Sequence, residues 1–143
     1  EITYGDWSSD VCSSDLPAYG QQDYLITASD YAIFFNVLFN ASCLGRNMSE
    51  YSLQLLTHCA YKDGLTKYID STVTVAHKFG ERGNEFEQEL HECGIVYLQN
   101  KPYLISIMTM GSDRTKLPEV ISEISRLVYK EMTKQKLAAN LHG

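Results

Sequence analysis

The second half of the chain holds three stretches in which apolar residues stop following a helical period and alternate, or become β-branched and aromatic. The first is STVTVAHKFG (71–80), which places Val73, Val75, His77 and Phe79 on one side of an extended chain. The others are ELHECGIVYL (89–98) and YLISIMTM (103–110), joined by the turn residues QNKP. The polar, glycine-containing run ERGNEFEQ (81–88) predicts a turn between the first two. Together they predict a three-stranded antiparallel meander.

Two helices are predicted before these strands. In TASDYAIFFNVLFNASCLG (27–45), Thr27 and Asp30 approximate a capping box, and Gly45 is the predicted C-terminal stop. The predicted apolar face of this helix is Tyr31, Phe34, Phe35 and Leu38. The run NMSEYSLQLLTHCAYKDG (47–64) predicts a second helix, capped by Asn47 or Ser49 and ended by Asp63-Gly64. Its predicted apolar stripe is Leu53, Leu56 and Ala60.

A third helix is predicted after the strands, with Pro118 in its first turn. Its predicted apolar residues are Val120, Ile124, Leu127 and Val128. The order helix, helix, three strands, helix predicts an α+β fold.

Composition narrows the function classes. The chain has 143 residues and a formal net charge of −6, with its basic residues scattered, which argues against a nucleic-acid partner. No apolar run is long enough to predict a membrane span. Four cysteines show no CxxC spacing, and three of them lie in apolar settings typical of buried thiols. None of the common nucleotide-binding or hydrolase-elbow motifs occurs, so no cofactor is predicted.

Candidate functional residues are most concentrated in the run VAHKFGERGNE (75–85). Lys78 can present an ammonium to an anionic ligand, and Gly80 leaves the strand uncrowded so that a substrate can lie against it. The alternative is that Lys78 is simply solvated before a turn. His77 is either a pH-sensitive group or a packed side chain with one bonded nitrogen.

A second cluster, HEC (91–93), suggests a metal site only at first sight. In a strand, His91 and Cys93 share one face while Glu92 points away, and no second pair of ligands is evident. No metal site is therefore predicted.

Taken together, several runs resemble the C-terminal half of class A β-lactamase-like serine hydrolases, relatives of the penicillin-binding proteins. They are DYLITASDYAIFFNVLFN, MSEYSLQLL, KDG, TVTVAHKFGE, ELHECGIVYLQNKPYLISIMT and EVISEISRLVYKEM, covering roughly 23–132. The resemblance implies the C-terminal part of a β-lactamase-like fold: two helices, a three-stranded meander and a C-terminal helix.

The resemblance also assigns roles in HKFG, which stands where the family has its K-T-G or K-S-G box. Lys78 would supply positive potential for the substrate carboxylate, and Gly80 would let the acyl substrate approach the strand. The backbone N–H of Glu81 would be one of two oxyanion-hole donors. Phe79 replaces the usual Thr or Ser and its hydroxyl, and His77, Lys78 and Phe79 would together contact the substrate.

The printed sequence contains no S-x-x-K, no S-D-N-like motif at family spacing and no counterpart of the Ω-loop Glu. Ser29-Asp30-Tyr31 resembles the second motif superficially but stands at a helix start. We therefore expect a truncated serine hydrolase, itself inactive. The parent would cleave the amide of a β-lactam or a peptidoglycan-related peptide outside the cytoplasm. The alternative is a non-catalytic module of the same fold that binds a peptide or ligand.

The opening segment bears on that choice. The residues DWSSDVCSSDL (6–16) are what a widely used sequencing-library adapter encodes, so 5–16 is interpreted as adapter translation. Residues 1–22 would then be a non-native or disordered leader, and 23–143 a partial β-lactamase-like domain. A native Ser/Asp-rich leader is the alternative, and different codons in the source DNA would support it.

Overall fold

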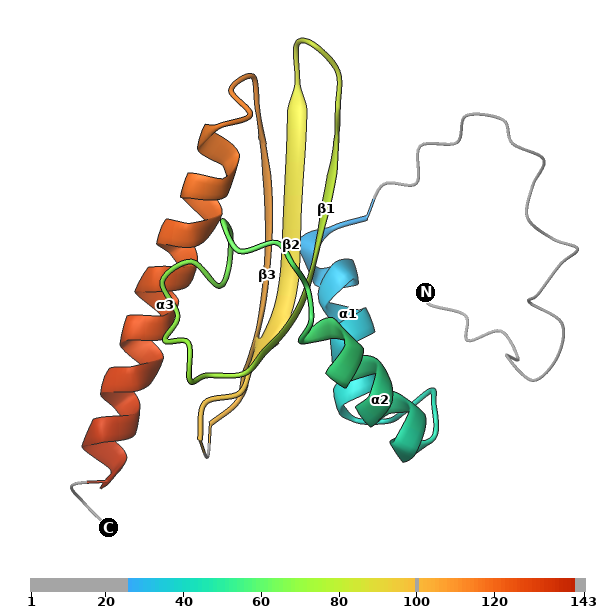
Figure 1. Cartoon of the computed structure of the whole chain (residues 1–143), viewed down its shortest axis with the longest axis vertical. Coiled ribbons are helices and arrows are strands. Elements are labelled where there is room, and N and C mark those ends of the chain that lie inside the picture. The colour runs from blue at the N-terminus through green and yellow to red at the C-terminus, as the bar shows by residue number, and fades with distance from the viewer. Residues whose placement is uncertain (1–25, 100, 141–143) are drawn as a thin grey trace, which may run out of the picture.

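A central sheet lies between two helical layers in this computed structural model, which describes residues 26–99 and 101–140 (Figure 1). One face of the sheet contacts α3, and the opposite face contacts α1 and α2. The predicted order of elements and the α+β class are confirmed. The elements are α1 (Ala28–Phe39), α2 (Arg46–Leu56), β1 (Val75–Gly83), β2 (Gln88–Val96), β3 (Tyr103–Gly111) and α3 (Lys116–Asn140).

The sheet is the predicted antiparallel meander, in the order β1-β2-β3. In its register His77 lies opposite Gly94, and Cys93 lies opposite Ser106. The predicted turn over 81–88 is shorter than expected, because β1 continues to Gly83 and β2 begins at Gln88. The turn itself is built on Asn84, whose Oδ1 accepts hydrogen bonds from two backbone N–H groups, at 2.8 and 3.0 Å.

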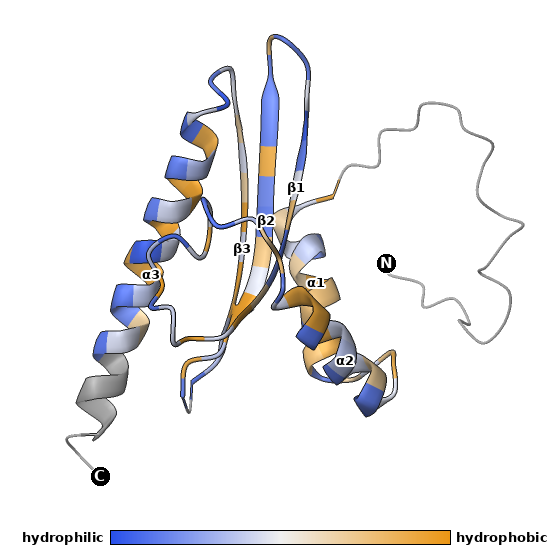
Figure 2. Cartoon of the chain, viewed as in Figure 1, coloured by the Kyte–Doolittle hydropathy of each residue, from blue (hydrophilic) through white to orange (hydrophobic). Residues whose placement is uncertain are grey.

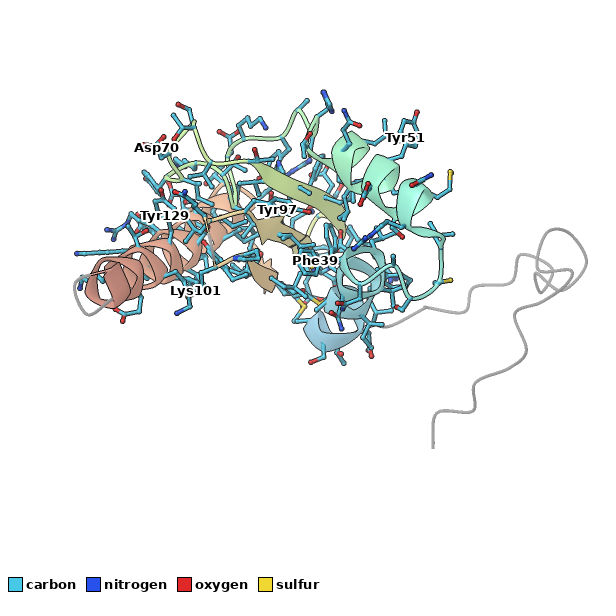
Figure 3. The ribbon with its side chains drawn as sticks, turned by 90° about the horizontal axis from the view of Figure 1, so that it is seen from below. Phe39, Tyr51, Asp70, Tyr97, Lys101 and Tyr129 are labelled. Carbon is cyan, nitrogen blue, oxygen red and sulfur yellow. The ribbon has the colours of Figure 1, made fainter. Side chains whose placement is uncertain are left out.

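Both faces of the sheet are buried, each in its own apolar cluster. On the α3 side the buried residues are Leu65, Val75, Leu90, Val96, Leu98, Ile105, Ile107, Leu117 and Ile121. On the α1 and α2 side they are Phe35, Leu53, Ala76, Cys93 and Ile95. Tyr97, which is labelled near Phe39 in Figure 3, contacts the Phe39 ring and packs against this second cluster. The central strand β2 is therefore covered from both sides.

The start of α1 is confirmed and its end is not. The side-chain oxygen of Thr27 accepts from the N–H of Asp30 at 3.1 Å, and Asp30 Oδ2 accepts from Thr27 N–H at 2.8 Å, which completes the capping box. The helix ends at Phe39 rather than before Gly45. Within the predicted apolar face Phe35 is buried, whereas Phe34 is 62% exposed.

Gly45 has the opposite role to the predicted one, because it is the N-cap of α2. The predicted caps Asn47 and Ser49 are wrong: both lie inside the helix, and Ser49 is buried there. The helix also ends at Leu56, well before the predicted stop at 63–64. The residues from 57 to 74 instead form a long connection that crosses to the α3 side of the sheet (Figure 1).

The helix α3 forms where predicted, with Pro118 in its first turn, but its apolar face is rotated from the predicted one. Over residues 116–134, where side-chain burial is described, its buried residues are Leu117, Ile121, Ser122 and Ser125. Three of the four predicted face residues are exposed: Val120, Ile124 and Leu127. Figure 2 shows hydrophobic residues interspersed with hydrophilic ones along this helix. None of the helices in the described ranges is long and apolar enough to cross a membrane.

Candidate functional site

Lys78 is the first exposed residue of β1, after three buried ones. Its Nζ is within hydrogen-bond reach of the carbonyl oxygen of Phe79 and 4.7 Å from the centroid of the Phe79 ring. The hydroxyl of Tyr31, on α1, donates to the carbonyl oxygen of Lys78 at 3.0 Å. Burial raises the pKa of Tyr31 to about 12, so this hydroxyl keeps its proton at ordinary pH. The backbone of Lys78 is thus fixed while its ammonium is accessible.

The Phe79 side chain lies on the α3 side of the sheet and packs against the cluster there. It stacks on Tyr61 of the long connection, with the ring centroids 4.4 Å apart and the planes at 27°. Burial, followed by the charges of Glu92, Asp63 and Glu81, raises the pKa of Tyr61 to about 12. The Phe79 side chain therefore serves as a packing surface for the connection.

Gly80 and Glu81 follow on the same strand. A Cβ built at Gly80 would meet no atom within 4 Å among the described residues. The Glu81 carboxylate accepts from Nη2 of Arg114 at 2.7 Å in an exposed ion pair, which contributes little to stability. A hollow of about 440 Å³ opens beside this part of β1; its lining includes Gly80, Glu81, Arg82, His91 and Met108.

His77 is fully buried, and it forms a hydrogen bond that the sequence reasoning missed. Its Nδ1 lies 2.6 Å from Oε1 of Glu92, and both side chains have no exposed surface. Because Glu92 also accepts from the N–H of Leu65, at 2.8 Å, the hydrogen-bond network makes Nδ1 of His77 the donor. Its Nε2 is buried without a hydrogen-bond partner among the described residues. The side chain of His77 therefore links β1 to Glu92 in the interior of the protein and is not exposed to a ligand.

Leu65 is held through both of its backbone polar groups, from two elements. Glu92 accepts from the N–H of Leu65, and the hydroxyl of Ser125, on α3, donates to the carbonyl oxygen of Leu65 at 2.7 Å. A Cβ at Gly64 would lie 1.8 Å from Oε2 of Glu92, so only glycine lets the backbone come this close. The connection is thereby fixed against both β2 and α3.

The structure brings the predicted residues together only as neighbours on β1: His77, Lys78, Phe79, Gly80 and Glu81. Sequence reasoning missed their supports Tyr61, Leu65, Glu92 and Tyr31, which lie far away in the chain. The HEC residues are arranged as predicted, with His91 and Cys93 facing α1 and Glu92 facing α3. Among the described residues, no group of three His, Cys, Asp or Glu side chains could hold a metal ion.

The fold is that of class A β-lactamases and of PBP-A. The structure of PBP-A superposes with a TM-score of 0.63 at 21% identity, covering 73% of this chain and 39% of that one. The chromosome-encoded β-lactamase of Vibrio parahaemolyticus gives a TM-score of 0.63 at 15% identity, covering 75% of this chain and 41% of that one. A PBP-A variant solved as an acyl-enzyme complex with penicillin G gives 0.61 at 20% identity, covering 73% and 39%.

The family model of the beta-lactamase enzyme family matches residues 7–132, and the chain belongs to that family. The resemblance inferred from the sequence is thereby confirmed. Comparison with curated protein sequences finds no similar protein. The chain spans about two fifths of the length of the solved structures that it matches.

Proposed function

We propose that this chain forms the cationic, substrate-binding wall of a serine hydrolase that opens an amide through an acyl-enzyme. The substrate class is a β-lactam or a peptidoglycan-related peptide. The observation that carries the proposal is the exposed ammonium of Lys78 on a strand that pairs only with β2 among the described residues, next to uncrowded Gly80. Membership of the beta-lactamase enzyme family supports the serine hydrolase class.

The proposed chemistry divides between this wall and a nucleophile. Lys78 attracts the substrate carboxylate, and the backbone N–H of Glu81 stabilises the oxyanion as the serine attacks. The printed sequence contains no S-x-x-K, so it shows no candidate for the nucleophilic serine and its base. We therefore propose that the chain binds substrate weakly and hydrolyses none, and that the parent acts outside the cytoplasm, with antibiotic resistance as one consequence.

Binding and turnover are tested separately. Benzylpenicillin, titrated into the chain and followed by NMR, should shift the side-chain resonances of Lys78 and the amide of Glu81. Lys78→Ala should weaken this binding about tenfold or more, since a charged hydrogen-bond donor is lost. Lys67→Ala is the matched control, because Lys67 is an exposed residue of the long connection and lines a different hollow.

Nitrocefin measures turnover in the same samples. The expected rate is equal for the wild-type chain and Lys78→Ala. Turnover by the wild-type chain above that control would contradict the proposed lack of activity, and equal benzylpenicillin binding by both would contradict the role of Lys78. Binding without an upstream serine–lysine pair in the source gene would instead support the non-catalytic ligand-binding module.

A further inference from the structure

The two strand neighbours of Lys78 are His77 and Phe79. Both are supported by contacts with one short segment of the chain, 61–65. On the N-terminal side of Lys78, His77 is bonded to Glu92, which also accepts from Leu65. On its C-terminal side, Phe79 stacks on Tyr61. Two separate supports of neighbouring strand residues therefore depend on one segment of the connection.

Glycines on both sides make room for this arrangement. A Cβ at Gly64 would lie 1.8 Å from Oε2 of Glu92 and 3.0 Å from a ring carbon of Tyr61. A Cβ at Gly94, opposite His77 on β2, would lie 2.7 Å from Cβ of His77. Real Cβ atoms do not make such contacts, so a side chain at either glycine would displace the His77–Glu92 pair or its neighbours.

A buried carboxylate is weak evidence of stabilisation even when it is hydrogen-bonded, because the cost of desolvation offsets the attraction. Apolar residues of similar volume would fill the same space without that cost. The carboxylate adds geometric specificity instead. It binds His77 and Leu65 at once, and this fixes β1 relative to the 61–65 segment. That segment in turn holds the Phe79 ring over which the Lys78 ammonium lies.

We propose that Glu92 is a positioning residue for the substrate-binding cation. Through His77 and Leu65 it keeps the 61–65 segment against β1, and thereby keeps Phe79 beneath the ammonium of Lys78. Removal of the carboxylate lets the Tyr61–Phe79 stack shift, and the ammonium then leaves its place beside the strand. The inference rests on the proposed function, because it assigns the support of the same cation.

The test measures the ring-current shift of the Lys78 Hε protons in the folded chain. Their position near the face of the Phe79 ring should move these resonances upfield in the wild type. Glu92→Gln keeps the size of the side chain, but its amide cannot accept from His77 and Leu65 with both end groups. We expect most of the upfield shift to be lost and benzylpenicillin binding to weaken about tenfold, the equivalent of one net hydrogen bond.

Two further variants separate positioning from general damage. Gly64→Ala displaces the carboxylate from the opposite side and should reproduce the loss, whereas Gly45→Ala, whose added Cβ meets nothing within 4 Å, should not. Glu89→Gln is the control on β2, since Glu89 lies near His91 on the other face. Spectra of folded protein only are compared, so a loss of stability alone leaves the shift unchanged.

The Lys78 ring-current shift and benzylpenicillin binding test two different proposals. An unchanged Lys78 shift in both Glu92→Gln and Gly64→Ala would overturn the positioning role, whatever the ligand does. If the wild-type chain does not bind benzylpenicillin, the proposed function fails. A ring-current shift lost in both variants would still support Glu92 as the residue that positions Lys78.

Discussion

The thiol of Cys93 lies in the middle of β2, with no exposed surface, beneath Tyr31 of α1. Burial is the main cause that raises its pKa to about 11. Cys43, by contrast, is exposed, so the expectation that thiols in apolar settings are buried is wrong for that residue. The Cys93 thiol therefore stays protonated at ordinary pH.

This contrast predicts different reactivities. Because the thiolate is the nucleophile, a pKa of about 11 leaves roughly one Cys93 in a thousand ionised at pH 8. Iodoacetamide at pH 8 should label Cys43 readily and Cys93 only after unfolding in urea. Mass spectrometry of the labelled peptides provides the measurement, with Cys43→Ser as the control. Equal labelling of both residues in the native chain would show that the helical cover over β2 opens easily.

At the same scale, the sequence was informative about Lys78 and not about its supports. The HKFG pattern identified the exposed cation and its neighbouring glycine from adjacent letters. Glu92 could not be recognised as buried, because a glutamate in an alternating strand is ordinarily exposed. Only the register that places Gly94 opposite His77, together with the path of the 61–65 segment, explains its burial.

Among the elements, α3 shows most directly how an apolar pattern can give the wrong face. Ile121 and Ile124 are three residues apart on one helix, yet Ile121 has no exposed surface and Ile124 is 39% exposed. We expect Ile121→Ala to lower the free energy of unfolding by about 2–5 kcal/mol, since it leaves a cavity. Ile124→Ala should change it by less than about 1 kcal/mol. Urea denaturation of the two variants measures the difference, and equal losses would favour the face predicted from sequence.

The reason for the rotated face is the pair of buried serines, Ser122 and Ser125. The hydroxyl of Ser125 donates to the carbonyl oxygen of Leu65, and that of Ser122 donates to the carbonyl oxygen of Glu119. Small residues with satisfied hydroxyls let the 57–74 connection pack closely against the helix. Long-range partners of this kind are not visible in the spacing of apolar residues, whereas the strands and their order are.

At the scale of the whole molecule, burial changes along the sheet. Residues 92–96 of β2 are all buried, whereas every residue from Glu81 to Glu87 is exposed. Amide hydrogen exchange should therefore be slowest in Cys93–Val96 and fastest around the turn at Asn84, since local opening is easiest where few apolar contacts form. NMR-detected exchange measures this gradient. Uniform protection along the hairpin would mean that the exposed end opens only with the whole domain.

The absence of a side chain at Gly64 and Gly94 has a consequence for how such a sequence can change over generations. A larger residue at Gly64 is tolerable only if the side chain at position 92 has already become shorter, because Oε2 of Glu92 lies 1.8 Å from the place of the added Cβ. At Gly94 the carbonyl oxygen of Ala76 lies 2.8 Å from the place of the added Cβ, so replacement of His77 makes no room. Positions 64 and 92 are therefore expected to be exchanged together among descendants, whereas position 94 is expected to stay glycine.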